Sequence, residues 1–229
     1  PTLLPYTTLL PIFDALKQCG VQVTILEAEE AFPDSCFVED TAVLTRKFAL
    51  ITNPGAPSRK GEIASMIPVI KQFYPENNIE YIKTPGTLEG GDVMMVGDHF
   101  YIGISARTNR EGAQQFINAL KKYDMSGEMV PLSTVLHLKT GLSYIENNNL
   151  LIGGEFLENP AFSHFHHIEV AAEEEYSANC IWVNGTVIVP EGYPTVLSAV
   201  QDAGYETITV DTSEYRKLDG GLSCLSLRF

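Results

Sequence analysis

Four segments of the chain carry apolar residues at the spacing of one helix face, with polar residues between them. The four apolar sets are Leu9, Ile12, Phe13 and Leu16; Ile63, Met66, Ile67 and Ile70; Ala113, Phe116, Ile117 and Leu120; and Val196, Leu197, Val200 and Ala203. Thr108 and Glu111 have capping-box spacing before the third set, and Pro194 suits the first turn of the fourth. The pattern predicts four amphipathic helices, each with one face buried on a sheet.

Short runs with the composition of β-strands lie between these helices, mostly in pairs. The paired runs are 37–44 with 48–52, 92–96 with 99–104, 142–145 with 150–152, and 181–183 with 186–189, and residues 224–229 form a last run without a downstream mate. A short polar segment, which we call an opening, precedes each of the five runs or pairs. Because hairpin, helix and strand also recur, we predict an α/β fold with an internal repeat. The unpaired last run further predicts a partner strand from a segment that precedes Pro1.

Composition narrows the class of protein and its partners. A length of 229 residues with 45% hydrophobic residues suits a single domain over residues 1–229. Lys and Arg number 15 against 29 Asp and Glu, and the resulting charge of -14 repels nucleic acid and anionic membranes while attracting small cations. The same charge could serve only to prevent aggregation. The cysteines, Cys19, Cys36, Cys180 and Cys224, have neither disulfide nor zinc spacing, so we expect a reduced, cytoplasmic setting.

The residues at or near the openings include a candidate catalytic set: Asp40, Glu89, His137 and Cys224. If each opening faces a common axis, these four side chains converge on one pocket. A thiolate can attack an electrophilic carbon, an imidazole can protonate the leaving group, and a carboxylate can orient the imidazole. Structural interpretations compete, because Cys224 could be a small buried hydrophobe and His137 a core histidine. Glu89, beside two glycines at the start of a buried strand, needs a specific partner.

Arg59 and Arg107 stand at predicted helix starts, where a positive charge is mildly unfavourable. This favours a role in gripping a substrate carboxylate through the paired guanidinium donors, with a solvated surface arginine as the alternative. His164, His166 and His167 are interpreted as solvated residues, because no carboxylate or thiol at ligand spacing accompanies them. The sequence therefore predicts no metal site.

Six segments resemble, in order along the chain, those of dimethylarginine dimethylaminohydrolases. They are residues 37–41 (Phe-Val-Glu-Asp-Thr), 53–59, 88–93 (Leu-Glu-Gly-Gly-Asp-Val), 105–109, 136–139 and 219–224. Six motifs in family order form a specific signal. The resemblance implies the pentein fold, a five-bladed α/β propeller of ββαβ modules with pseudo-fivefold symmetry. Its N-terminal strand and the loop that covers the substrate would precede Pro1.

The resemblance also implies roles for individual residues. Cys224 would be the nucleophile, His137 the general acid and base, and Glu89 the carboxylate that orients the imidazole. The substrate contacts would be Asp40 and Glu39 at the guanidinium, Asp34 and the backbone carbonyl of Leu218 at the α-amino group, Arg59 and Arg107 at the α-carboxylate, and Phe37 at the pocket wall. The implied reaction hydrolyses dimethylarginine or monomethylarginine to citrulline and the free amine through a covalent thiouronium, without a metal or organic cofactor. The implied assembly is a homodimer.

Three other interpretations stay open from the sequence. An arginine deiminase, or another pentein hydrolase, would release ammonia from unmodified arginine, although the compact chain leaves no room for the helical insertion domain of the deiminase. A non-catalytic binder of guanidinium ligands would keep the pocket but would have no need of the nucleophile. An unrelated α/β domain would use all of these residues structurally.

Overall fold

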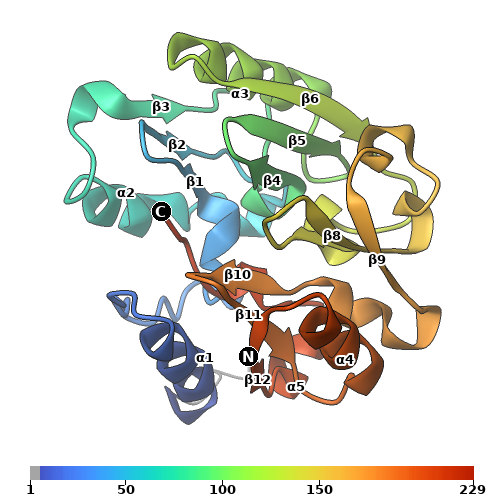
Figure 1. The fold of residues 1–229 in the computed structure, drawn as a ribbon. Helices are drawn as coiled ribbons and strands as arrows, with labels where there is room; N and C mark the ends of the chain where they lie inside the picture. The colour runs from blue at the N-terminus through green and yellow to red at the C-terminus, as the bar shows by residue number, and fades with distance from the viewer. Residues whose placement is uncertain (1–5) are drawn as a thin grey trace. The chain divides into compact units, whose positions relative to one another are not determined.

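Four three-stranded sheets form the framework of the protein in the computed structural model, which describes residues 6–229 and, within the first helix, the side chains from residue 11 onward (Figure 1). In each sheet an antiparallel hairpin is followed by a third strand that runs parallel to the second. The strands are β1 (Ala42–Leu44), β2 (Ala49–Ile51) and β3 (Ile79–Tyr81); β4 (Val93–Val96), β5 (His99–Ile104) and β6 (Ser126–Pro131); β7 (Leu142–Tyr144), β8 (Asn149–Gly153) and β9 (His166–Val170); and β10 (Ile181–Val183), β11 (Thr186–Pro190) and β12 (Glu206–Val210). The predicted α/β class and its repeat are confirmed at this level.

The predicted helices are present, and three of them connect the second and third strands of a sheet. They are α1 (Tyr6–Gln18), α2 (Ile63–Ile70), α3 (Arg110–Lys122) and α4 (Pro194–Asp202), to which the structure adds the short α5 (Ser213–Arg216). Leu9 of the first apolar set lies outside the described side chains. The capping prediction was wrong by one residue, because Asn109 Oδ1 accepts the Gly112 N–H at 2.8 Å while the Thr108 hydroxyl accepts the backbone N–H of Glu89.

The third module has short 3-10 turns where the others have a helix. These are η6 (Gly154–Phe156) and η7 (Pro160–Phe162), which follow β8 and precede β9. Phe156 and Phe162 are fully buried, and their rings pack edge to face with centroids 6.0 Å apart. Two aromatic anchors thus fill the space of a helix in a stretch where the helical pattern is weak and Pro160 interrupts it.

Residue contacts divide the chain into two compact units. One unit comprises residues 1–28 and 140–223, and the other, which we call the His137 unit, comprises residues 29–139 and 224–229. The His137 unit has its own core, formed around Phe48, Phe100 and Phe116, and α3 packs on the sheet of β4, β5 and β6 (Figure 1). The other unit has a core of aliphatic residues that includes Val187 and Val200. Among residues 6–229, no helix combines the length and apolarity needed to cross a bilayer.

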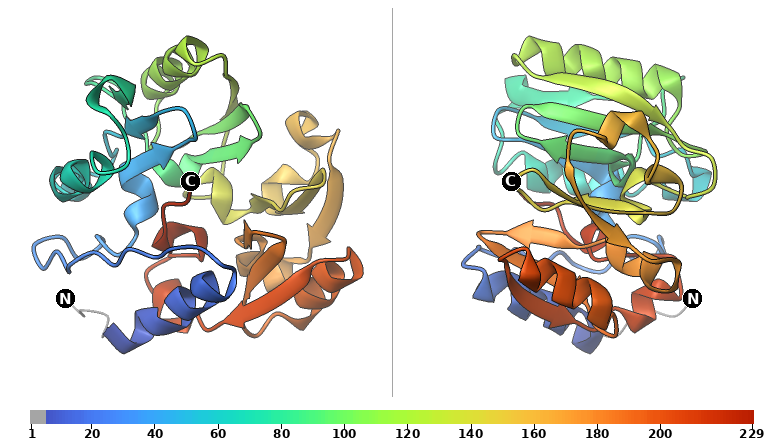
Figure 2. Two further views of the ribbon diagram at one scale, coloured as in Figure 1. Left: turned by 60° about the vertical axis from the view of Figure 1, so that its left-hand side comes forward. Right: turned by 45° about the vertical axis from the view of Figure 1, so that its right-hand side comes forward.

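Several openings of the repeated modules are 3-10 turns rather than strand ends. These turns are η1 (Val38–Thr41), η4 (Gly90–Asp92), η5 (Leu138–Thr140) and η9 (Ser223–Leu225); η2 (Pro57–Arg59), η3 (Glu76–Asn78) and η8 (Ala172–Ala178) lie elsewhere. The strand predicted for 37–44 therefore begins only at Ala42. The strand predicted for 224–229 was wrong, since no described residue supplies a ladder partner for it. Side chains hold this last segment instead: Arg228 lies 3.5 Å from Glu39, and the Phe229 ring packs on Phe73. Figure 2 draws the segment as a coil that runs to the C-terminal mark, without a strand arrow.

Candidate active site

A histidine and a glutamate from distant parts of the His137 unit form a buried pair. Glu89 immediately precedes η4 and is 1% exposed, and His137 immediately precedes η5 and is 8% exposed. The Nε2 atom of His137 lies 2.7 Å from Oε2 of Glu89. The other oxygen, Oε1, accepts the backbone N–H of Ala56 at 3.1 Å. Both carboxylate oxygens are therefore engaged, which fixes the orientation of the imidazole.

A second carboxylate, Asp40 in η1, approaches the same imidazole. Its Oδ1 lies 4.0 Å from Nε2 of His137 and accepts the Gly91 N–H at 2.8 Å. Its Oδ2 accepts a hydrogen bond from Nη1 of Arg59 at 2.5 Å. Burial opposes ionisation here, but the charges of His137 and Arg59 outweigh it and lower the pKa of Asp40. Asp40 is therefore a buried anion at neutral pH.

The acids around His137 set its protonation state. Burial alone would lower the pKa of the imidazole, but the charge of Asp40 and the hydrogen bond to Glu89, with a smaller contribution from Asp92, raise it from 6.5 to about 9. The ring is thus a cation at neutral pH. A protonated imidazole in this position can act as a general acid.

The two glycines after Glu89 are required by close approach. A Cβ atom on Gly91 would lie 2.8 Å from both Cγ and Nδ1 of His137 and 3.0 Å from Oδ1 of Asp40. A Cβ atom on Gly90 would lie 1.9 Å from the carbonyl oxygen of Glu39. The Gly-Gly dipeptide therefore lets the backbone of η4 contact both the imidazole and the η1 turn.

Arg59 is buried and bound by protein groups. Its Nε donates to Glu62 at 3.0 Å, and its Nη2 donates to Glu62 at 2.7 Å and to the carbonyl oxygens of Phe37 and Asp34 at 2.9 and 3.2 Å. With Asp40 on Nη1, this guanidinium joins η1 and the preceding loop to η2. In this structure Arg59 is the counter-ion of two buried acids, and its predicted contact with a substrate carboxylate stays a prediction.

Arg107 is more accessible than Arg59, with a side chain that is 32% exposed. Its Nη1 lies 3.9 Å from Oε1 of Glu89, and its backbone N–H donates to Oγ of Ser105 at 2.9 Å. The side chain therefore stands beside the buried pair with part of its surface free to meet a ligand. Of the two predicted carboxylate-binding arginines, Arg107 has the better exposure.

Glu39 has two cationic partners of its own. Its Oε1 lies 2.5 Å from Nζ of Lys139 and 3.5 Å from Nη2 of Arg228. Because Arg228 follows Cys224 by four residues, the Glu39 ion pair also holds the segment that carries the thiol. A role for Glu39 at the guanidinium of a substrate stays a prediction.

The chain is similar to known proteins over most of its length. The family model of eukaryotic N,N-dimethylarginine dimethylhydrolases matches residues 10–157. A dimethylarginine dimethylaminohydrolase of Pseudomonas aeruginosa is 56% identical over 215 residues, which cover 94% of this chain and 84% of the relative. This chain belongs to the dimethylarginine dimethylaminohydrolase family.

Solved structures agree with the family assignment. A crystal structure of the Pseudomonas aeruginosa member in complex with citrulline superimposes with a TM-score of 0.94 at 55% identity, covering 95% of this chain and 85% of that one. The N-terminal domain of an arginine dihydrolase from Cyanobacteria, 18% identical, superimposes with a TM-score of 0.84 over 97% of this chain and 84% of that one, and shares the fold.

Cys224 of this family member is half-buried in η9 and forms no disulfide. It belongs to the His137 unit together with Asp40, Glu89 and His137. Burial raises the pKa of Cys36 to about 11 and also raises that of Cys180, which suits inert thiols. Leu218 is exposed and belongs to the other unit, so its predicted contact with a substrate stays a prediction.

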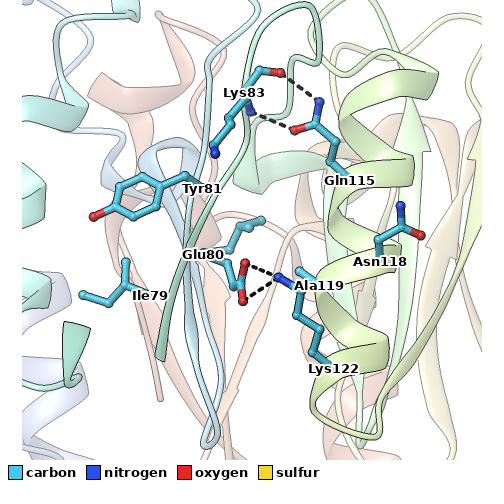
Figure 3. Close-up of a pocket in the computed structure, with 9 residues that line it drawn as sticks. Ile79, Glu80, Tyr81, Lys83, Gln115, Asn118, Ala119 and Lys122 are labelled. Atoms are coloured by element: carbon cyan, nitrogen blue, oxygen red, sulfur yellow. Dashed lines mark hydrogen bonds and ion pairs between the residues drawn. The ribbon is translucent and has the colours of Figure 1, made fainter. Parts of the chain in front are cut away.

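A pocket on the surface of the His137 unit lies apart from these residues. Its volume is 420 Å³, and it is lined by Leu50, Ile79, Glu80, Tyr81, Lys83, Gln115, Asn118, Ala119 and Lys122 (Figure 3). Lys122 lies 2.8 Å from Glu80, and the Gln115 side chain is hydrogen-bonded to the backbone of Lys83, so these side chains already have partners. None of the predicted site residues of this family member lines the pocket.

Asp40, Glu89 and His137 also have donor atoms within 4.8 Å of one another, a spacing compatible with a metal ion. Arg59 and Gly91 already bind Asp40, and Ala56 binds Glu89. A metal would have to displace the proton that joins His137 to Glu89. The contacts therefore fit a hydrogen-bonded acid–base cluster.

Sequence inspection missed two buried acids, Glu62 and Asp92. Glu62 lies three residues after Arg59, a helical spacing that could have suggested the ion pair. Asp92 closes the Glu-Gly-Gly-Asp motif of the family, yet its contacts with Ser105 and Leu138 come from distant segments. No local signal in the sequence indicates those partners.

Proposed function

We propose that this protein hydrolyses N-ω-methylated arginines to citrulline and an alkylamine, with Cys224 as the nucleophile. The observation that carries the proposal is the buried pair of His137 and Glu89, with the ionised Asp40 beside it, in the unit that also contains Cys224. Nothing in the proposed reaction requires a metal or an organic cofactor.

The charges of the site suit a substrate with a cationic side chain. Asp40, assisted by Glu39, would hold the guanidinium, because a carboxylate accepts two parallel guanidinium N–H bonds. Arg107, with Arg59 behind it, would bind the α-carboxylate. The α-amino group would meet Asp34 and the backbone carbonyl of Leu218, and Phe37 would line the pocket, as in the family pattern.

The first chemical step forms a bond between sulfur and carbon. Cys224, as a thiolate, attacks the central guanidinium carbon of the bound substrate. Nε2 of His137 is held by Glu89, so we assign proton transfer to Nδ1, which protonates the substituted nitrogen as its bond to carbon breaks. Dimethylamine or methylamine leaves, and an S-alkylthiouronium remains on Cys224.

The second step restores the thiol. The now neutral His137 takes a proton from water, and the oxygen attacks the thiouronium carbon. The bond between carbon and sulfur then breaks, the thiolate is regenerated, and citrulline leaves with the water oxygen in its ureido group. One water is consumed, and one amine and one citrulline are formed.

We infer that both units form one pentein domain with five modules around a common axis. The inference is supported by the four repeated modules, three of which are ββαβ, and by the polar turns that open several of them.

Product analysis tests the proposed function. The full chain is incubated with asymmetric dimethylarginine, monomethylarginine and arginine, and citrulline, amine and ammonia are quantified. We expect citrulline and amine in equal amounts from the methylated substrates. A preference for arginine with release of ammonia would replace the proposal with an arginine deiminase activity.

Two cysteine variants complete this test. Cys224→Ser is expected to abolish turnover and to keep substrate binding in calorimetry, because the binding groups stay in place. The matched control Cys180→Ala removes a buried thiol of the other unit and should retain turnover. Normal turnover by Cys224→Ser would eliminate the proposed nucleophile.

A further inference from the structure

Asp92 is a completely buried acid that the reaction scheme above does not use. It ends η4, three residues after Glu89, and is 0% exposed. A buried carboxylate is costly unless its oxygens find donors. Gly103 of β5 provides space for it, because a Cβ atom there would lie 2.7 Å from Oδ1 of Asp92.

One oxygen of Asp92 holds the segment that carries His137. Oδ1 accepts the backbone N–H of Leu138, the next residue, at 3.0 Å. This bond fixes the peptide between His137 and Leu138, from which the imidazole reaches Glu89. The charge of Asp92 also contributes to the raised pKa of His137.

The other oxygen holds the turn that carries Arg107. Oδ2 accepts the hydroxyl of Ser105 at 2.6 Å, and Oγ of Ser105 in turn accepts the backbone N–H groups of Arg107 and Thr108 at 2.9 and 3.1 Å. The Thr108 side chain also bonds to Asp92 and accepts the backbone N–H of Glu89 at 3.1 Å. Asp92 is therefore bonded to the segments of His137, Arg107 and Glu89 at once.

We propose that Asp92 is a positioning residue that sets the imidazole of His137 and the guanidinium of Arg107 in one fixed arrangement. The proposal rests on the proposed function and deepens it, because the first group would act on the reacting atoms and the second would bind the substrate carboxylate. A single acid thus couples the acid–base group to the recognition of the amino acid end of the substrate.

The substitution Asp92→Asn tests both contacts with little change in volume. If the amide oxygen introduced by this substitution keeps the bond to Leu138, the amide nitrogen faces the Ser105 hydroxyl. That hydroxyl already accepts two backbone N–H groups, and it can no longer donate its own proton to a carboxylate oxygen. We expect kcat to fall by about tenfold or more, because small displacements of catalytic groups are costly. KM should rise in the same variant.

The pH profile supplies a measurement that a purely structural role would leave unchanged. Burial raises the pKa of Asp92, but its charge, with those of Asp40 and Glu89, contributes to the raised pKa of His137, and the substitution removes that contribution. The alkaline limb of kcat should therefore move to lower pH in Asp92→Asn. The NMR titration of the His137 imidazole should move in the same direction without any substrate present.

Ser105→Ala separates the contact of Asp92 with Ser105 from its contact with Leu138, and it tests the proposal even if Asp92→Asn does not fold. It removes the support of the Arg107 turn and leaves the bond from Leu138 to Asp92. We expect KM for methylated arginine to rise roughly two- to tenfold, as for a lost hydrogen bond, with kcat changed less. The control Ile117→Val, in the core of the same unit, should change neither parameter beyond its effect on stability.

The outcomes distinguish this proposal from the proposed function. A wild-type protein that forms no citrulline would refute the function, and the His137 titration would still decide the role of Asp92. The positioning role would be overturned if wild type is active and Asp92→Asn has the same kcat, KM and pH profile as the control Ile117→Val. Loss of kcat without a shifted titration, and no effect of Ser105→Ala on KM, would also overturn it.

Discussion

The contact between Gly91 and the His137 ring gives a sharp test of the site geometry. Gly91→Ala adds one methyl group at a point that lies 2.8 Å from two ring atoms and 3.0 Å from Oδ1 of Asp40. Carbon atoms in ordinary contact lie about 3.5–4.0 Å apart. The methyl group therefore forces the ring, the carboxylate or the η4 backbone to retreat by about 0.7 Å or more.

This displacement has a predictable effect on catalysis. The 2.7 Å bond between His137 and Glu89 must lengthen or bend if the ring retreats, so Nδ1 also leaves its working position. Misplacement of a catalytic group by about 1 Å can cost on the order of a hundredfold in rate. We expect kcat of Gly91→Ala to fall by about ten- to a hundredfold. KM should change less, since Arg107 is not displaced.

Steady-state formation of citrulline measures this effect, with Ile117→Val as the control. That control removes one methylene from the core of the same unit and should cost about 1 kcal/mol of stability without moving the ring. Denaturation midpoints of both variants show whether stability alone explains a loss of rate. A folded Gly91→Ala with kcat within about twofold of wild type would refute the packing argument.

Three further predictions concern the charges. His137 has a pKa of about 9 against 6.5 in its ordinary state, so its protonation stabilises the fold fully below about pH 6.5, and this stability is lost as pH rises through 9. Urea titrations should therefore show wild type more stable than His137→Gln by on the order of 3 kcal/mol at low pH, and this difference should disappear above pH 9. Glu89→Gln should lower the pKa of His137 and move the alkaline limb of kcat to lower pH; an unmoved limb would exclude Glu89 as the partner. Arg59→Ala should destabilise the fold by about 3–5 kcal/mol in chemical denaturation, because buried acids lose their counter-ion. The Arg107 side chain is partly exposed, so Arg107→Ala should mainly raise KM, and equal stability losses in the two variants would contradict this.

The sequence was sufficient for the repeated module and for part of the site. Paired runs of β-strand composition, such as 181–183 with 186–189, predicted hairpins that the structure contains, because strand composition is a local property. The convergence of Asp40, Glu89 and His137 was also predicted, from the openings of successive modules. The repeat made this possible, since equivalent positions in stacked modules lie close together.

Other features depended on distant partners and could not be predicted. The run 224–229 has β-type composition, but a strand needs a neighbour, and side-chain contacts of Arg228 and Phe229 hold it instead. Arg59 was predicted to bind a substrate from its place at a predicted helix start, yet Glu62 and Asp40 surround it in the structure. Burial of a charged residue is visible only when the segments that cover it are in place.

Glu62, Arg59, Asp40, His137 and Glu89 form a row in which negative and positive groups alternate. Neutralising any interior member leaves two like charges facing each other across the gap, with little water to separate them. Redesign of this site for a neutral or anionic ligand therefore has to exchange adjacent members together, as an acid with its neighbouring base. Libraries that vary these positions singly would mostly sample destabilised proteins.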